Sequence, residues 1–306
     1  MARDGLNIDV IRRMFRRFPS ASVRELEPTE SALVESILRR RVKVTRTARS
    51  ATIRTLIATA EESTGKAVVF LQGGAPRDIV RSTEPNDVDA AYVGTDIDAI
   101  KSAMIERYGQ DTVMGQTSKV IGLVGVGVGA DSFDLKALHL HECYAESPAN
   151  SLMIHVGTKT LIDPFGQGVD DARNLVWRIP CSDRDTWADY VRFGLWRMLK
   201  FRVRGYRVPD DDMVWIYEHF VRKIDEHHKS MWSSGPLGAF QTVGTAPALS
   251  IACSDLERLY ASGALRMPPH EFLLKLVERG VLSPPDPVRQ SVIPMRKGVK
   301  VVRAKK

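Results

Sequence analysis

A short stretch of the chain combines a glycine pair, an arginine and two aspartates at spacings that suit phosphate and metal chemistry. Residues 68–71 are a β-branched and aromatic run that predicts a buried strand, and Gly73-Gly74 follows it. Because glycine has no Cβ, the backbone can turn tightly there and its amides can approach phosphate oxygens. Pro76 suits the first turn of a following helix, and Arg77 adds a charge shaped for phosphate.

Two carboxylates follow this turn closely. Asp87 and Asp89 flank Val88 in a segment that predicts a second strand. Residues two apart on a strand point to the same side of the sheet, so the two carboxylates would lie together. They repel each other unless a cation lies between them, and hard oxygen ligands suit Mg²⁺, with Mn²⁺ as the alternative ion. Two such ions would stabilise the attacking and the leaving oxygen of an in-line phosphoryl transfer. The alternative, a plain turn with two solvated aspartates, is disfavoured by the order and close spacing of these residues.

A third carboxylate is predicted in a β-hairpin farther along the chain. Residues 119–124 and 133–137 flank a glycine-rich turn, and Asp134 alternates with the apolar Phe133 and Leu135. Asp134 is therefore a candidate third catalytic carboxylate, which would also act as a base toward an attacking hydroxyl. A solvated hairpin aspartate is the alternative.

These motifs resemble, in kind and order, those of the class II tRNA nucleotidyltransferases and bacterial-type poly(A) polymerases, within the polymerase-β-like nucleotidyltransferases. The family's first motif, Gly-Gly-x-x-Arg-Asp followed by Asp-x-Asp, is matched by Gly73, Gly74, Arg77, Asp78, Asp87 and Asp89. Residues 163–171 are similar to its Asp-Pro-Phe-Gly-Gly motif, and residues 188–192 are similar to its base-selecting Glu-Asp-x-x-Arg motif. The resemblance spans roughly residues 66–208 and depends on elements that occur in the family's order.

The resemblance implies roles for the matched residues. It implies metal binding and catalysis by Asp87 and Asp89, with Asp134 standing where the family has a glutamate. It implies nucleotide binding by Gly73, Gly74, Arg77, Asp78, Asn150, Asp189 and Arg192. Asp189 and Arg192 are three apart on a predicted helix, where a carboxylate and a guanidinium can imitate a Watson–Crick edge and read a base. A surface salt bridge is the other interpretation of that pair.

Three features of the chain depart from the family's pattern. Residues 144–151 replace a segment that the family uses for the nucleotide's ribose, and only Asn150 survives from it. Ala188 stands in place of the glutamate of the base-selecting motif. The part after residue 208 is shorter than the family's usual neck, body and tail.

Positive charge is concentrated at the two ends of the chain, whose net charge is +7. Residues 1–54 contain 13 basic and 6 acidic residues, and residues 296–306 contain 6 basic and no acidic residues. This asymmetry suits a polyanion that is held by the ends while the acidic centre works on its terminus. We predict RNA contacts by a basic set made up of Arg39, Arg40, Arg41, Lys43, Arg197 and Lys200. For the C-terminal tail, a merely solvated end is an equal alternative.

Composition also bears on the cellular compartment. Cys143, Cys181 and Cys253 are far apart and odd in number, which predicts reduced thiols in a cytoplasmic, reducing environment. No run of about 18 apolar residues predicts a membrane span, so no membrane contact is expected. The arginine-rich start contains Asp4 and Asp9, which disfavours a transit peptide.

The pattern of apolar residues predicts an α+β protein in four parts. We predict a basic helical N-terminal extension over 1–62, a catalytic domain over 63–180, a helical neck and RNA-binding region over 181–282, and a Pro-rich linker with a basic tail over 283–306. A helix with a basic face is expected from residue 183 to a stop at Gly205. The resemblance implies that the second part is a polymerase-β-like nucleotidyltransferase head with a small mixed sheet.

Together these features predict a template-independent RNA 3′-end nucleotidyltransferase that uses ATP and two Mg²⁺ ions and acts on an mRNA-like or tRNA end. Poly(A) polymerase is the first interpretation, because the short C-terminal part argues against a body that measures a tRNA acceptor stem. A CCA-adding tRNA nucleotidyltransferase is the alternative. A second alternative is a catalytically inactive RNA-binding or structural relative, which the altered ribose segment and Ala188 support. Retention of Asp87 and Asp89 speaks against it, since adjacent carboxylates destabilise a fold unless a metal binds.

Overall fold

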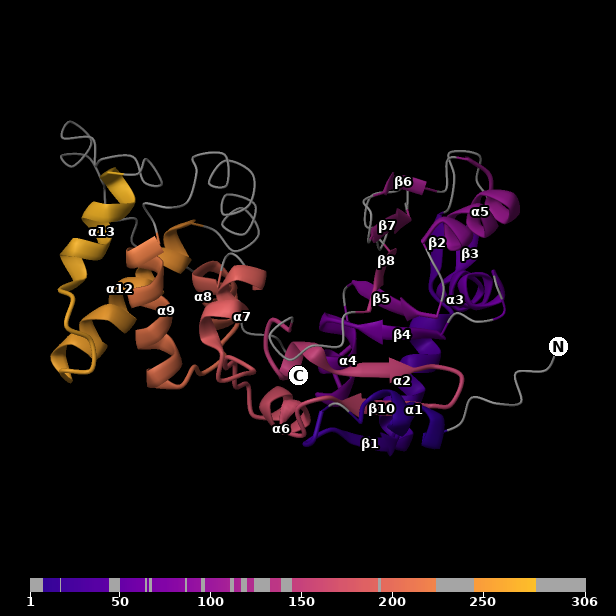
Figure 1. Cartoon of the computed structure of the whole chain (residues 1–306), viewed down its shortest axis with the longest axis horizontal. Coiled ribbons are helices and arrows are strands. Elements are labelled where there is room, and N and C mark those ends of the chain that lie inside the picture. Colours follow the sequence, from indigo (N-terminus) through magenta and orange to yellow (C-terminus); the bar gives the residue numbers. More distant parts are fainter. Residues whose placement is uncertain are drawn as a thin grey trace, which may run out of the picture.

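The structure is a computed structural model of the 306-residue chain. Its elements form two groups, a sheet with flanking helices and a set of helices that follows it in sequence (Figure 1). This arrangement confirms the predicted α+β class. The residues that it describes are 8–16, 18–43, 50–63, 65, 68–85, 87–94, 97–110, 113–116, 120–123, 133–138, 145–191, 194–223 and 245–278.

An eight-stranded mixed sheet is the centre of the first group. Its strands lie in the order β1 (Ser22–Glu25), β10 (Thr160–Asp163), β9 (Met153–His155), β4 (Val68–Gln72), β5 (Val88–Val93), β8 (Phe133–Ala137), β7 (Val120–Leu123) and β6 (Val113–Gln116). Within this sheet, β5 and β8 pair in parallel and the other neighbours are antiparallel. The predicted strand before the glycine pair is β4, the predicted strand around the two aspartates is β5, and β7 and β8 confirm the predicted hairpin strands.

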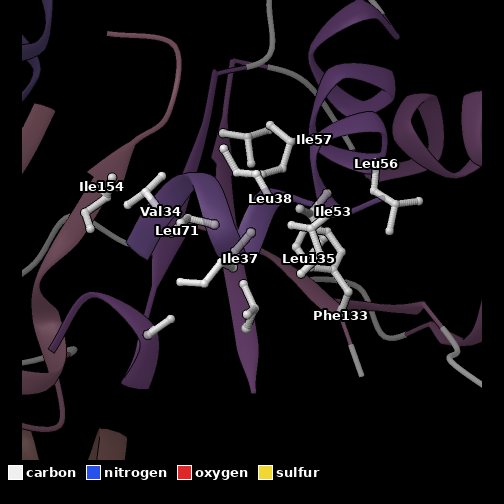
Figure 2. Close-up of a cluster of buried hydrophobic side chains, with 14 of the residues drawn as sticks. Val34, Ile37, Leu38, Ile53, Leu56, Ile57, Leu71, Phe133, Leu135 and Ile154 are labelled. Carbon is white, nitrogen blue, oxygen red and sulfur yellow. The ribbon is translucent and has the colours of Figure 1, made fainter. Parts of the chain in front are cut away.

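Helices cover this sheet and build two separate hydrophobic clusters with it, one of which contains α1. They are α1 (Ile8–Met14), α2 (Pro28–Leu38), α3 (Ile53–Glu62), α4 (Gly74–Val80), α5 (Ile97–Tyr108), the short 3₁₀ helix η3 (Ala149–Ser151) and α6 (Gly168–Arg173). The side-chain oxygen of Thr52 caps α3 by accepting a hydrogen bond from the Thr55 amide. Apolar side chains of α2 and α3 pack against Leu71 of β4 and Leu135 of β8, all of them buried (Figure 2).

The N-terminal segment differs from the helical extension that we predicted. Strand β1 pairs with β10 at the edge of the main sheet, and β2 (Arg41–Lys43) pairs with β3 (Ser50–Thr52) in a separate two-stranded sheet. The expectation of helices alone was wrong because strands of three or four residues are too short to show an alternating pattern. The predicted division into domains stays a prediction.

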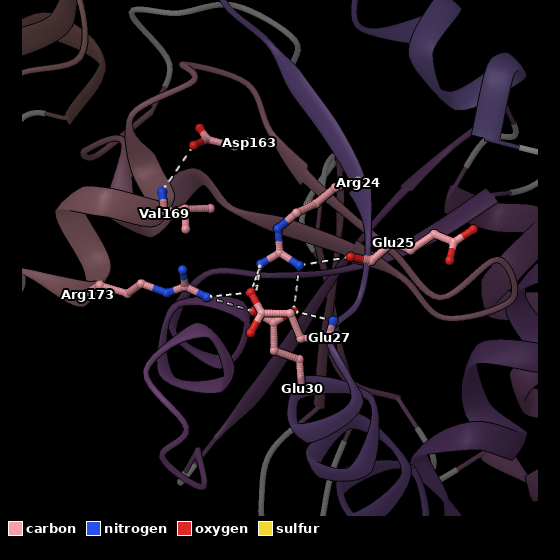
Figure 3. Close-up of polar contacts among 7 residues, drawn as sticks. All are labelled: Arg24, Glu25, Glu27, Glu30, Asp163, Val169 and Arg173. Atoms are coloured by element: carbon pink, nitrogen blue, oxygen red, sulfur yellow. Dashed lines mark hydrogen bonds and ion pairs between the residues drawn. The ribbon is translucent and has the colours of Figure 1, made fainter.

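An ion-pair cluster holds the N-terminal segment in place. Arg24 of β1 donates two hydrogen bonds of 2.7 Å to the carboxylate of Glu30, which raises the pKa of Arg24 (Figure 3). Arg173 of α6 donates to Glu27 at 2.8 Å. Because Glu30 is 1% exposed, its bidentate pairing with Arg24 satisfies a carboxylate that burial would otherwise destabilise.

The second group consists of helices around an aromatic core. They are α7 (Arg184–Val191), α8 (Gly194–Val203), α9 (Asp210–Lys223), α12 (Thr245–Ala261) and α13 (Pro269–Glu278). Trp177, Trp187 and Phe201 are buried together, and Arg202 binds Asp255 through two hydrogen bonds that join α8 to α12. Gly205 has φ 86°, in agreement with the predicted stop. Residues 192–193 of the predicted helix, and the predicted tail over 283–306, lie outside the described residues.

Every helix in the described ranges is too short or too polar to cross a bilayer.

A buried aspartate shapes the loop after β10. Asp163 is 2% exposed, and its carboxylate accepts hydrogen bonds from the amides of Phe165, Gly166 and Val169, the last of which is drawn in Figure 3. Burial raises the pKa of Asp163, and these amide bonds oppose the rise. The motif at 163–171 therefore has a structural function, which is to fold the loop tightly between β10 and α6.

We expect Gly166→Ala to lower the free energy of unfolding by about 2–4 kcal/mol. Gly166 has φ 69°, and an added Cβ would overlap the carbonyl oxygen of Ser20. Gly205→Ala is the matched control, because Gly205 also has a positive φ but nothing lies within 4 Å of its added Cβ. Chemical denaturation should show a loss of about 1 kcal/mol for the control. Equal losses in the two variants would contradict the steric argument.

Candidate functional site

A cavity of about 550 Å³ lies between the sheet and the helices that follow it. This volume is typical of a site for a small organic ligand. Residues from both groups of elements line it, so the cavity depends on how the two groups pack. Eight residues that we predicted for the site line it: Gly73, Gly74, Arg77, Asp87, Asp89, Asn150, Arg197 and Lys200.

The two aspartates face the glycine pair across neighbouring strands. Gln72, the last residue of β4, is in register with Asp89 of β5. A Cβ added to Gly73 would lie 3.2 Å from Oδ2 of Asp89, and a Cβ added to Gly74 would lie 4.0 Å from Oδ1 of Asp87. Gly73 has φ 78°, a conformation that glycine adopts without strain. The glycine pair thus leaves room for both carboxylates at the cavity wall.

The donor set at this wall suits a hard divalent cation. Asp87 and Asp89 supply carboxylate oxygens that line an open cavity, and water and phosphate oxygens can complete the coordination of Mg²⁺ or Mn²⁺. Asp134 lies on β8 in register with Asp89, but its side chain is outside the described part of the structure. Among the described side chains, no group of three metal-binding residues occurs. The role of Asp134 as third carboxylate therefore stays a prediction.

Arg77 is fixed in the cavity wall by three contacts. Its Nε donates to Asp78 at 3.0 Å, and its Nη1 donates to Oδ1 of Asn150 at 2.8 Å. Its guanidinium carbon lies 5.3 Å from the ring centre of Phe201 on α8, a cation–π contact. Asp78 does not line the cavity. Asp78 thus holds the guanidinium of Arg77 in place, and its predicted nucleotide contact stays a prediction.

Asn150 connects Arg77 to a glutamate that sequence analysis missed. Its Nδ2 donates to Oε2 of Glu146 at 3.2 Å, and the same oxygen lies 3.6 Å from Nη1 of Arg197. Glu146 lies in the segment that departs from the family's pattern, so no motif indicated it. The four-residue spacing between Glu146 and Asn150 is the signal that a search of this segment could have used.

One face of α8 and its C-terminal extension forms the opposite wall. Arg197, Lys200, Phe201 and Arg204 line the cavity at positions i, i+3, i+4 and i+7. We missed Arg204, although its spacing from Arg197 places it on the same helical face. Burial lowers the pKa of Lys200, the charges of Arg204, Arg197 and Arg77 lower it further, and Glu146 opposes this.

Several predicted residues do not meet at this cavity. Asp189 is exposed on α7 and does not line it, because the buried residues Trp187 and Ala188 turn their face of α7 into the helical core. Arg192 lies outside the described residues. Base selection by this pair therefore stays a prediction.

The predicted RNA-binding residues near the N-terminus also lie away from the cavity lining. Arg39 ends α2, Arg40 donates to Glu84 at 2.9 Å, and Arg41 and Lys43 belong to β2. Contact of these four residues with RNA stays a prediction.

No protein-family model and no curated protein matches the sequence. Solved structures do match the fold. The Bacillus stearothermophilus CCA-adding enzyme in complex with CTP has 13% identity and a TM-score of 0.50, covering 76% of this chain and 52% of that one. A CCA-adding enzyme with ATP has 14% identity and a TM-score of 0.47, covering 85% of this chain and 55% of that one.

The Thermotoga maritima CCA-adding enzyme complexed with tRNA has 14% identity and a TM-score of 0.45, with the same coverage of 85% and 55%. The chain thus spans about half the length of these enzymes. At such identities the likeness shows the fold alone. This chain therefore shares its fold with about half of the Bacillus stearothermophilus enzyme.

We expect Gly73→Ala to weaken Mn²⁺ binding by about tenfold or more, because its Cβ would lie 3.2 Å from Oδ2 of Asp89 and displace that carboxylate. Gly74→Ala is the comparison, since its Cβ would lie 4.0 Å from Asp87 and should have a smaller effect. Electron paramagnetic resonance of free Mn²⁺ measures both, and circular dichroism checks the fold. Unchanged Mn²⁺ affinity in Gly73→Ala would contradict the argument that the added Cβ displaces a metal-binding carboxylate.

Proposed function

We propose that the chain is a template-independent nucleotidyltransferase that extends RNA 3′ ends, and that CCA addition to tRNA is its activity. The observation that carries this proposal is the pair of carboxylates, Asp87 and Asp89, facing the backbone of Gly73 and Gly74 in a cavity that also holds Arg77. Carboxylates for metals and a glycine turn with an arginine for phosphates are the parts that phosphoryl transfer requires.

Each of these residues has a defined task in the proposed reaction. Asp87 and Asp89 would hold two Mg²⁺ ions, which supply charge stabilisation for the attacking and leaving oxygens when bound. The Gly73 and Gly74 backbone leaves space for the triphosphate, and Arg77 neutralises part of its charge. Asp78 and Asn150 keep the guanidinium of Arg77 in place through hydrogen bonds of 3.0 and 2.8 Å. The helical region would contact the RNA.

The choice between the two RNA products favours CCA addition. Poly(A) synthesis was the first interpretation of the sequence, and its basis was the short C-terminal part. The likeness in fold to CCA-adding enzymes, among them one solved with CTP, supports CCA addition, with a tRNA end as the substrate. ATP and CTP would both be substrates of such an enzyme. An mRNA-like substrate has no comparable support.

We expect the double variant Asp87→Ala, Asp89→Ala to slow nucleotide addition by about 10³-fold or more, because no carboxylates would remain at this wall to hold the metal ions. The assay is extension of labelled RNA with Mg²⁺ and nucleoside triphosphates. Glu106→Gln, which removes one carboxylate at an exposed position on α5, is the control and should keep full activity. Persisting activity in the double variant would refute the metal assignment.

We expect tRNA transcripts that lack the 3′ CCA to gain three nucleotides when CTP and ATP are both present. CTP alone should add two nucleotides, and ATP alone should extend only a transcript that already ends in CC. Long tails from ATP alone on an unrelated RNA would instead establish poly(A) synthesis. RNA binding without extension of any RNA would establish the catalytically inactive relative.

A further inference from the structure

We propose that Phe18, paired with Phe165, is a stacking platform for the last base of the RNA that the chain extends. The segment before β1 then supplies part of the candidate active site, a role that no sequence motif indicated. This inference rests on the proposed function, which makes an RNA 3′ end the substrate.

The segment that carries Phe18 packs on the same face of the sheet as Asp89. Ile11 of α1 and the nearby Phe15 are buried in one cluster with Phe70 of β4. Phe70 and Gln72 are two apart on β4, so their side chains point to one face of the sheet. Gln72 is in register with Asp89 on β5, and residues opposite each other on paired strands share a face. The N-terminal segment therefore covers part of the face that carries the carboxylates.

A row of aromatic rings leads from the interior of this face to the cavity. The ring centres of Phe70 and Phe15 are 6.2 Å apart, and those of Phe15 and Phe18 are 6.4 Å apart. Phe18 meets Phe165, in the loop after β10, edge to face at 5.9 Å. Phe15 and Phe70 are buried, whereas Phe18 and Phe165 are partly exposed and line the cavity. Buried rings thus fix a ring whose surface stays open to a ligand.

The surroundings of Phe18 and Phe165 suit a nucleobase. Their neighbours in the cavity lining include the apolar residues Leu138, Met153 and Pro164. A base is a flat ring whose faces stack on aromatic side chains, and such stacking does not require a particular base. A phosphate would gain nothing from this apolar surface, because it needs charged or hydrogen-bonding partners.

This apolar surface is close to the carboxylates. Gln72 is in register with Asp89 on one side and with Met153 of β9 on the other, and all three line the cavity. Neighbouring strands lie about 4.8 Å apart, so about 10 Å separates Met153 from Asp89. A terminal nucleotide whose base stacks here would have its ribose near the proposed metal site.

Positive charge beside Phe18 favours an RNA end over a free nucleotide as the source of the base. Arg13 and Arg16 are exposed and lie within five residues of Phe18. Proteins that hold single-stranded RNA combine cations along its backbone with aromatic side chains on which its bases stack. A free nucleotide has no further phosphates for these arginines to contact. Its own phosphates have their proposed place at the glycine pair and Arg77.

The test compares two labelled single-stranded RNAs in Mg²⁺ without nucleotides. One ends in cytidine, and the other is identical except that its 3′-terminal residue is abasic. Fluorescence anisotropy with the full chain measures both affinities. We expect the wild-type chain to bind the cytidine end about tenfold more tightly, because only that end has a base to stack on Phe18. Phe18→Ala should reduce the difference to about twofold or less.

Matched variants separate stacking from packing. Phe18→Leu removes the ring but keeps apolar bulk, so it repeats the test if thermal denaturation shows that Phe18→Ala unfolds. Phe18→Tyr retains a ring and should retain the preference for the cytidine end. Tyr260→Ala is the aromatic control, since Tyr260 is 47% exposed on α12 and does not line the cavity. A preference that survives in Phe18→Leu, or its absence from the wild-type chain, would overturn the proposal.

Two further measurements identify the source of the base. Calorimetric titration with CTP should give affinities within about twofold for the wild-type chain and Phe18→Ala. A loss of CTP affinity in Phe18→Ala, with the preference for the cytidine end unchanged, would overturn the proposal in favour of the incoming base. Combined Arg13→Gln and Arg16→Gln should weaken both RNAs by the same factor, because phosphate contacts do not depend on the base. Unchanged affinity for both RNAs would contradict an RNA strand beside α1.

Failure of this inference is distinguishable from failure of the proposed function. A chain that adds no nucleotides but loses its preference for the cytidine end on substitution of Phe18 keeps the stacking platform and loses the function. A chain that completes tRNA ends, with the same preference in the wild-type chain and in Phe18→Leu, keeps the function and loses the platform.

Discussion

The candidate site is organised by the placement of Asp87 and Asp89 beside the backbone of Gly73 and Gly74. Two carboxylates at one cavity wall are stable only if the surrounding backbone holds them there and a cation can be bound. The antiparallel register of β4 and β5 places Asp89 beside the end of β4, and Gly73 turns away at φ 78° without a Cβ. Any other residue at Gly73 would meet Oδ2 of Asp89 at 3.2 Å. The register of β4 and β5 and the backbone conformation of Gly73 therefore both position Asp89 in the cavity wall.

Arg77 connects the cavity wall that carries Asp87 and Asp89 to the helices that follow the sheet. Its guanidinium binds Asp78 and Asn150 on the sheet side and lies over Phe201 of α8. The indole nitrogen of Trp187 on α7 donates to the carbonyl of Ala145, a cavity-lining residue, at 2.9 Å. These contacts fix the distance between the aspartates and the cations of α8. A shift of the helices would change the cavity and the separation of its positive and negative walls.

The N-terminal segment contains structure that local sequence patterns do not predict. Its helices were visible from apolar spacing, but β1 has only four residues, and its place beside β10 follows from pairing with residues far along the chain. The hydrogen bond from Arg173 to Glu27 likewise joins residues 146 positions apart, whose closeness requires the folded chain. Short strands gain their stability from their neighbours, so their own sequence carries little information.

The chemistry of one wall could be predicted from the sequence: Gly73, Gly74, Arg77, Asp87 and Asp89 meet in the cavity because their order and spacing act through local structure. It also located β4, β5, β7 and β8 and the main helices, whose patterns are periodic. The residues of the other wall depend on how the helices pack. Glu146 and Arg204 entered the site, whereas Asp189 did not, because the packing of α7 and α8 sets which helical face meets the sheet. That packing arises from contacts distant in sequence, which local spacing does not encode.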